Sequence, residues 1–270
     1  ALAAAADVAV VVVGTSAEIE SEGVDRESLA LPGRQNELVD RVLEVNPRTV
    51  VVVNAGAPVE LPWADRAPAV LLSWFPGQEF GNALADVLLG HTEPGGRLPT
   101  SWPVVAEDCP VLSTRPRSGV LAYDESIHLG YRGWARTGRT PRYPFGHGLG
   151  YTTWEYGEAR AEVGQENCVV RIPVTNTGRR RGKTVAQVYA SRTDSAIDRP
   201  RTWLVGFTVV EADPGETVAA EIGLSSRAFA HWDVTARSWQ LEPGEFALAI
   251  GASSSDIRAI TTVVVDSGQP

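Results

Sequence analysis

The feature that most constrains the fold is an uninterrupted apolar run, Val8–Val13, which leads directly into an acidic loop. Valine favours strands, and a strand without polar alternation is typical of a parallel sheet that is covered on both faces. A second such run, Thr49–Asn54, follows an amphipathic segment that ends at Asn46-Pro47. Because the intervening residues suffice for a helix, a right-handed parallel crossover is the expected connection.

The same alternation continues to about residue 100. Helical spacing places four apolar residues on one face of the segment between the two runs: Leu38, Val39, Val42 and Leu43. A third strand is predicted over 69–74, and a helix over 77–89 that Gly90 ends. These β/α units predict an αβα sandwich with a mainly parallel sheet. The first residues look like the last turn of a helix, so we expect this sandwich to be incomplete.

The carboxyl-terminal part of the chain has the pattern of an all-β domain. Two segments alternate with period two, Val170-Ile172-Val174 and Phe246-Leu248-Ile250, and Pro-Gly turns lie between short strands. This predicts a β-sandwich of fibronectin or immunoglobulin type. Residues 108–157 are rich in proline, glycine and aromatics and are interpreted as an ordered linker. The predicted domains are therefore 1–107, 108–157 and 158–270.

Charge and composition exclude several classes of partner and site. The formal charge of −9 opposes binding to nucleic acid or to an anionic membrane surface, and no apolar run is long enough for a spanning helix. The four histidines are scattered, and Cys109 and Cys168 lack metal-ligand spacing, so no metal site is predicted. Two unpaired cysteines favour a reducing, cytoplasmic compartment. Secretion stays open, because a leader would lie upstream of Ala1.

The acidic loop offers candidates for acid/base chemistry. Glu18, Glu20, Glu22 and Asp25 lie close together after the first strand, and Arg26 follows them. In α/β sheets, ligands bind beyond the carboxyl ends of the strands. A glycosidase needs one protonated and one ionised carboxyl group. Like-charged neighbours would raise the pKa of one another, while Arg26 would keep at least one carboxylate ionised. A solvated loop or a calcium-like oxygen cluster remains the alternative.

Several ordered motifs carry a family resemblance that covers nearly the whole chain. Glu20-Ser-Glu-Gly-Val-Asp-Arg26, Trp74-Phe-Pro-Gly-Gln-Glu79 and Asn82–Gly90 resemble the carboxyl-terminal sandwich domain of the family 3 glycoside hydrolases, the β-glucosidase and β-xylosidase group. Tyr143–Thr152 is similar to the linker of that family. Asn176-Thr-Gly178, Gln187-Val-Tyr189 and Leu204-Val-Gly-Phe207 resemble its fibronectin type III-like domain.

The resemblance implies a retaining β-glycosidase, most closely a β-glucosidase, which hydrolyses terminal non-reducing β-D-glycosyl residues by double displacement. It implies that Glu18 is the acid/base, with Glu20 and then Glu22 as alternatives. The Asp nucleophile and most sugar contacts would lie in an amino-terminal (β/α)₈ barrel that this chain lacks. The chain alone would then be inactive, and neither a metal nor an organic cofactor is needed. Ala17 departs from the family, where glycine often precedes the acid.

A different class of function also fits the residues. The chain could be a non-catalytic module that binds carbohydrate or another protein. Trp74, Trp102 and Trp134 could stack on sugar rings, although packing inside the protein is the favoured interpretation. Glu22, Asp25 and Arg26 are expected to form a salt-bridged turn that holds the loop rather than to bind sugar. A second chain carrying a barrel would distinguish the enzyme from the module.

Overall fold

The computed structural model describes residues 1–23, 25–111, 115–164 and 167–266. The chain forms two compact units. The first combines Ala1–Leu88 with Trp102–Thr114, and the second combines Leu89–Ser101 with Arg115–Pro270. In the described residues no helix has both the length and the apolar character needed to span a membrane.

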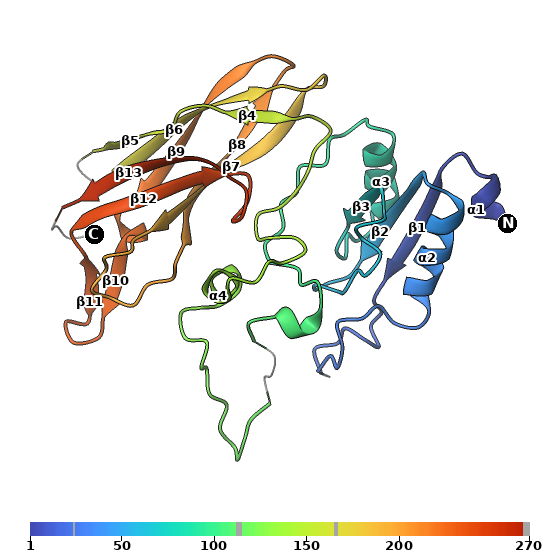
Figure 1. The fold of residues 1–270 in the computed structure, drawn as a ribbon, viewed down its shortest axis with the longest axis horizontal. Helices are drawn as coiled ribbons and strands as arrows, with labels where there is room; N and C mark the ends of the chain where they lie inside the picture. Colours follow the sequence, from blue (N-terminus) through green and yellow to red (C-terminus); the bar gives the residue numbers. More distant parts are fainter. Residues whose placement is uncertain (24, 112–114, 165–166, 267–270) are drawn as a thin grey trace. The chain divides into compact units, whose positions relative to one another are not determined.

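The first unit is built on a parallel sheet with the strand order β1-β2-β3 (Figure 1). Its elements are α1 (Leu2–Ala5), β1 (Ala9–Gly14), α2 (Gln35–Val45), β2 (Thr49–Asn54), β3 (Ala69–Leu72), α3 (Phe80–Leu88) and the short 3₁₀ helix η1 (Ala106–Asp108). β1 pairs with β2 from Ala9↔Thr49 to Gly14↔Asn54. Helix α2 connects these two strands and packs against both. The predicted α/β architecture with parallel crossovers is confirmed.

The burial of β1 differs from the expectation that both faces are covered. Val11 and Val13 are buried at 8 and 3 % exposure, whereas Val8, Val10 and Val12 remain 52, 47 and 54 % exposed. No other described segment covers the face on which these even-numbered valines lie. That part of the prediction is therefore wrong for this chain. The neighbouring strand β2, in the middle of the sheet, buries Val51–Val53 completely.

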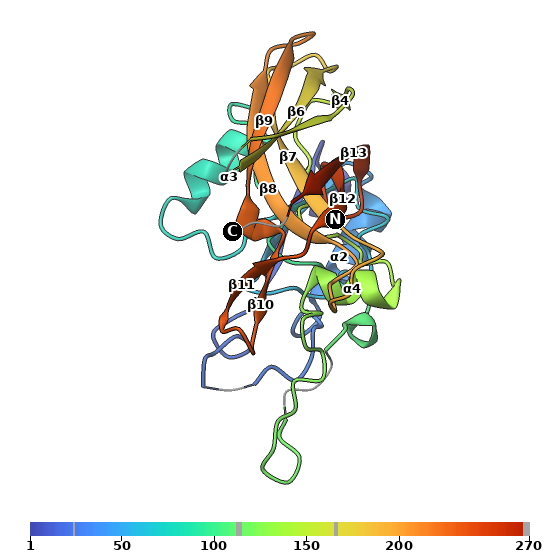
Figure 2. The same cartoon turned by 90° about the vertical axis from the view of Figure 1, so that its left-hand side faces the viewer.

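The second unit is a β-sandwich preceded by irregular chain and one short helix (Figures 1 and 2). The elements are α4 (Tyr131–Thr137), β4 (Trp154–Tyr156), β5 (Arg160–Val163), β6 (Asn167–Asn176), β7 (Gly182–Ser191), β8 (Trp203–Ala212), β9 (Thr217–Ser225), η2 (Ser226–Ala228), β10 (Ala230–Asp233), β11 (Ser238–Leu241), β12 (Gly244–Gly251) and β13 (Ile257–Val265). One antiparallel sheet has the order β13-β12-β7-β8. In the other, β6 pairs with β9 on one side and with β4 and β5 on the other.

The core of the second unit confirms the predicted period-two pattern. Val170, Ile172 and Val174 of β6 are fully buried, and so are Phe246, Leu248 and Ile250 of β12. They belong to one cluster with side chains of β7 and β9. Burial of these alternate apolar residues between two sheets is the main stabilisation of such a sandwich.

Candidate functional site

The carboxyl end of β1 is held in place by α2 and β2. The Gly14 N–H donates to Gln35 Oε1 at 2.7 Å, and Gln35 Nε2 donates back to the Gly14 carbonyl at 2.8 Å. The Thr15 N–H donates to the carbonyl of Asn54, the last residue of β2, at 3.0 Å. The acidic loop therefore starts from a fixed point at the carboxyl edge of the sheet, where ligands bind in folds of this type.

A tight turn carries Glu18 directly beyond this point. The N–H groups of Ile19 and Glu20 both donate to the carbonyl of Ser16, at 2.9 and 2.8 Å. Glu18 and, further along, Glu22 are exposed to solvent. Within the described part of the chain, neither of these two carboxylates has a hydrogen-bond or ion-pair partner.

Glu20 is in a different environment from its neighbours. Its Oε2 accepts hydrogen bonds from Thr15 Oγ1 and from the Gly56 N–H, both at 2.7 Å. Its Oε1 lies 2.9 Å from Arg26 Nη1, with 12 and 15 % of the Glu20 and Arg26 side chains exposed. Arg26 also donates from Nη2 to the Pro58 carbonyl at 3.0 Å. The predicted salt-bridged turn of Glu22, Asp25 and Arg26 is wrong in its partners, because Arg26 pairs with Glu20 instead.

The three carboxylates predicted as acid/base candidates therefore lie on one loop but differ in their surroundings. Charge-assisted hydrogen bonds stabilise the ionised form of a carboxylate. Glu20 accepts hydrogen bonds on both oxygens, which suits a residue that holds the loop in place. Glu18 and Glu22 are open to solvent, so either can meet a ligand above the sheet edge.

Two residues of this site were not predicted from the sequence, Thr15 and Gly56. Gly56 follows β2 and supplies the N–H that binds Glu20. A Cβ atom at this position would lie 2.5 Å from Cε2 of Phe75 and 3.0 Å from Oε2 of Glu20. Only glycine fits without displacing one of these groups. Local sequence gives no signal for this contact, because the partners are far apart in the chain.

Aromatic residues follow β3 near the same edge. Trp74 has a positive φ of 55°, which is rare for a bulky residue. Its ring packs edge-on against the ring of Trp102, with the two ring centroids 6.0 Å apart. Trp102 is 1 % exposed and Trp134, in the second unit, 6 % exposed. Their burial supports the packing interpretation for these two tryptophans. Phe75, next to Gly56, is 57 % exposed.

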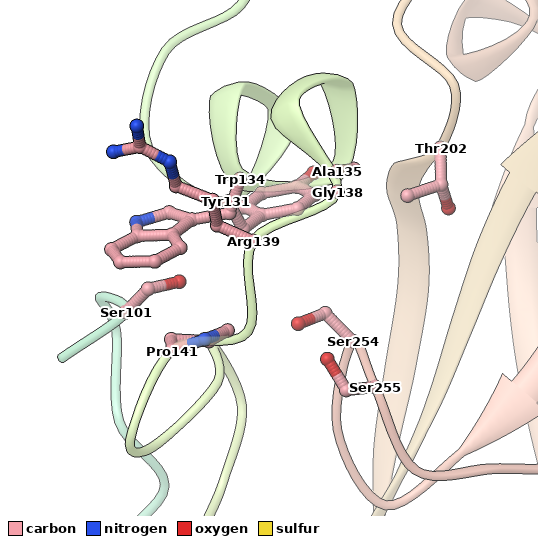
Figure 3. Close-up of a pocket in the computed structure, with 10 residues that line it drawn as sticks. All are labelled: Ser101, Tyr131, Trp134, Ala135, Gly138, Arg139, Pro141, Thr202, Ser254 and Ser255. Carbon is pink, nitrogen blue, oxygen red and sulfur yellow. The ribbon is translucent and has the colours of Figure 1, made fainter. Parts of the chain in front are cut away.

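The second unit contains a small cavity of about 170 Å³ (Figure 3). Tyr131, Trp134 and Arg139 line it from α4 and the residues that follow, and the hydroxyls of Ser101 and Ser254 face it as well. The buried Ser101 hydroxyl has no hydrogen-bond partner in the described residues. The cavity can hold ordered water or a small polar molecule. None of the described residues that line it is an Asp or a Glu.

In residues 1–23, 25–111, 115–164 and 167–266, no three His, Cys, Asp or Glu side chains are grouped as a metal site requires. Of the carboxylates at the sheet edge, Glu20 is bound by an arginine, a hydroxyl and a backbone N–H group.

Family models match both halves of the chain. Residues 1–151 match the glycosyl hydrolase family 3 C-terminal domain, and residues 184–254 match the fibronectin type III-like domain. The chain is 40 % identical over 268 residues to a beta-glucosidase of Kluyveromyces marxianus and 38 % identical over 265 residues to one of Rhizobium radiobacter. These matches cover 98 and 95 % of this chain and 32 % of each relative. The chain thus spans about a third of the length of the curated relatives it matches.

Solved structures give the same result. The crystal structure of the Kluyveromyces marxianus beta-glucosidase in complex with glucose matches with a TM-score of 0.93 and 39 % identity, over 98 % of this chain and 32 % of that one. Beta-glucosidase 3B from Thermotoga neapolitana, in complex with glucose, matches with a TM-score of 0.90 and 33 % identity. That match covers 100 % of this chain and 39 % of the other.

Proposed function

Because the chain belongs to glycosyl hydrolase family 3, we propose that it is the carboxyl-terminal portion of a retaining β-glucosidase and supplies the acid/base carboxylate from its acidic loop. The substrate class is a β-linked glucoside, as the names of the relatives suggest. The nucleophilic carboxylate comes from an amino-terminal (β/α)₈ barrel, encoded in the same precursor or in a second chain.

In this mechanism the two carboxyl groups act on opposite sides of the glycosidic bond. The acid/base first protonates the leaving-group oxygen while the Asp nucleophile attacks the anomeric carbon. The same group, now ionised, then takes a proton from the water that hydrolyses the glycosyl-enzyme. The acid/base must therefore gain and lose a proton in every cycle and must reach solvent and substrate.

The single observation that carries the proposal is the difference between Glu20 and its neighbours. Both oxygens of Glu20 are bound by Arg26, Thr15 and the Gly56 N–H, which argues against the second-ranked candidate. Glu18, the residue favoured by the sequence, is exposed and has no partner among the described residues, which supports its role as the acid/base. Glu22 is exposed in the same way and is its competitor.

The need for an amino-terminal portion is supported by surface left uncovered in the first unit. Val10 and Val12 of β1 are about half exposed. Helix α3 has an apolar face, yet none of its residues is buried. Apolar faces of this kind are normally buried by a further layer in an α/β sandwich. In the proposed enzyme, the part of the sandwich that this chain lacks would supply that layer.

The test is made on the assembled enzyme, with barrel and carboxyl-terminal portions together. Glu18→Ala and Glu22→Ala are compared on cellobiose and on an aryl β-glucoside with an activated leaving group. Loss of the acid/base should slow cellobiose hydrolysis by about 10²–10⁴-fold, spare the first step with the activated substrate, and allow azide to restore turnover. Glu27→Ala, at an exposed position on the same segment, is the matched control.

Two outcomes would contradict the proposal. If both Glu18→Ala and Glu22→Ala hydrolyse cellobiose at the parental rate, the acidic loop does not supply the acid/base. If the 270-residue chain hydrolyses β-glucosides without a barrel, the division of the two catalytic carboxylates is wrong. A glycosyl azide product of β configuration from the rescued variant would identify the acid/base residue and the retaining mechanism together.

A further inference from the structure

The carboxylate of Glu20 joins three parts of the first unit that are separate in sequence. Thr15 follows β1, Gly56 follows β2, and Arg26 lies at the far end of the acidic loop; all three donate to this carboxylate at 2.7–2.9 Å. Arg26 continues the connection to the chain after β2 through the Pro58 carbonyl. A single side chain thus fastens the loop at its start, middle and end.

Both acid/base candidates lie between these attachment points. Glu18 lies between Thr15 and Glu20, and Glu22 lies between Glu20 and Arg26. An exposed side chain on a free loop would occupy many positions, and each position away from the glycosidic oxygen reduces the rate. A displacement of about 1 Å at a reacting group can cost roughly 100-fold in rate.

We propose that Glu20 is a positioning residue, whose carboxylate fastens the acidic loop to the carboxyl ends of β1 and β2 and so fixes the acid/base over the sheet edge. This inference rests on the proposed function of the loop. It assigns to Glu20 a role in proton transfer without direct contact with the substrate.

The residues around Glu20 direct hydrogen-bond donors at its carboxylate. Glycine at position 56 leaves room for its N–H to make this contact, since a Cβ there would lie 2.5 Å from the Phe75 ring and 3.0 Å from Glu20 Oε2. Thr15 points its hydroxyl at the same oxygen. The low exposure of Glu20 and Arg26 limits screening by water, so their attraction is stronger than that of a surface pair.

The experiment replaces Glu20 by glutamine in the assembled enzyme. Glutamine keeps the size of the side chain but removes the charge that binds Arg26. We measure kcat/KM for aryl β-glucosides with leaving groups of rising pKa, because only poor leaving groups need the proton. Glu20→Gln should lower kcat/KM by about 10- to 100-fold for substrates with poor leaving groups. For substrates with activated leaving groups, kcat/KM should stay within about twofold of the parental value. A melting temperature records any general loss of stability.

Two further variants keep the test decisive. Glu37→Gln removes a carboxylate that is also paired with arginines, Arg34 and Arg41, but on the exposed surface of α2. It should behave like the parent. Thr15→Val removes one of the three hydrogen bonds to Glu20 and preserves shape, so it should reproduce the leaving-group pattern at smaller amplitude, even if Glu20→Gln folds poorly.

The outcomes separate this inference from the proposed function. Suppose that Glu18→Ala or Glu22→Ala slows poor leaving groups selectively and is rescued by azide. If Glu20→Gln and Thr15→Val then change kcat/KM equally for all substrates, or do not change it, the positioning role is wrong and the proposed function stands. If azide restores Glu20→Ala instead, Glu20 is itself the acid/base and the positioning role is overturned. If the change in kcat/KM is independent of the leaving group for every loop variant, both proposals fail.

Discussion

The Arg26 guanidinium lies 2.9 Å from the Glu20 carboxylate, and only 15 and 12 % of the two side chains are exposed. Removing one partner of such a pair leaves the other charge without compensation. We expect Arg26→Ala to destabilise the first unit by about 2–4 kcal/mol, near the lower end of the range for buried pairs. Arg26→Lys keeps the charge but loses hydrogen bonds, so its effect should be smaller.

Urea denaturation of the isolated chain measures this effect. The control is Arg48→Ala, since Arg48 is paired with Asp7 at 3.7 Å and both side chains are largely exposed. That surface pair should contribute less than about 1 kcal/mol. Equal losses for the two variants would show that the pair of Glu20 and Arg26 is no stronger than a surface contact.

In the second unit, Asn176 is fully buried and satisfies several backbone groups at the end of β6. Its Nδ2 donates to the carbonyls of Arg180 and Ala212 at 2.7 and 2.9 Å, and its Oδ1 accepts from the Gly178 N–H at 3.0 Å. Asn176→Ala leaves these groups unsatisfied, and we expect a loss of about 2–4 kcal/mol in the free energy of unfolding. Thr175→Ala, which removes an exposed hydroxyl pair with Thr217, should cost far less in the same denaturation experiment.

Glu242 makes the stability of the second unit depend on acidity. Burial by itself would raise the pKa of Glu242, but hydrogen bonds from Ser195, the Ala196 N–H and Arg199, with the charge of Arg192, lower it overall. The folded state therefore binds this proton less readily than the unfolded state. The stabilisation is complete above the ordinary glutamate pKa of about 4.3 and is lost as the pH falls through the lower folded value.

Glu242→Gln should accordingly lower stability at pH 7 and flatten its decline between about pH 5 and pH 3. The free energy of unfolding, measured in urea at several pH values, checks both effects. An unchanged slope in the variant would mean that other carboxylates cause the acid sensitivity.

The two cysteines are free in the structure. Burial raises the pKa of the Cys168 thiol. The pKa of the Cys109 thiol is raised by burial and then by the nearby carboxylates of Asp108, Glu60 and Glu107. Because the thiolate is the reactive form, both should react slowly with a disulfide reagent at pH 8, Cys168 more slowly than the less buried Cys109. In the chain unfolded by urea, both thiols should react at the rate of an unperturbed thiol. Fast reaction of Cys168 in the native chain would contradict its burial.

Much of the fold follows from local patterns. β2 begins and ends at the predicted residues, and the alternate residues of β6 and β12 are buried as expected, because one buried face imposes period two. Other elements gave no comparable signal. α4 has only seven residues, about two turns, which is too short for apolar periodicity to identify a helix. β8 exposes apolar side chains such as Phe207 and Val209 at about 60 %, which obscures its alternation.

Only some features of the acidic loop could be predicted from the sequence. Its position after β1 and its carboxylates were evident from the chain. The choice of partner for Arg26 was not, because Glu20, Glu22 and Asp25 are all close to it in sequence. Gly56, which follows β2, favours Glu20 by donating to its carboxylate. Such a contact depends on the packing of three chain segments, and no local pattern records it.

The half-covered strand β1 also affects how the chain behaves when it is prepared alone. β1 forms one border of its sheet, and no described strand pairs with its outer side. An unpaired strand border next to exposed valines is a template for the same strand of another molecule. The isolated chain should therefore self-associate as its concentration rises, and charged residues in place of Val10 and Val12 should keep it monodisperse.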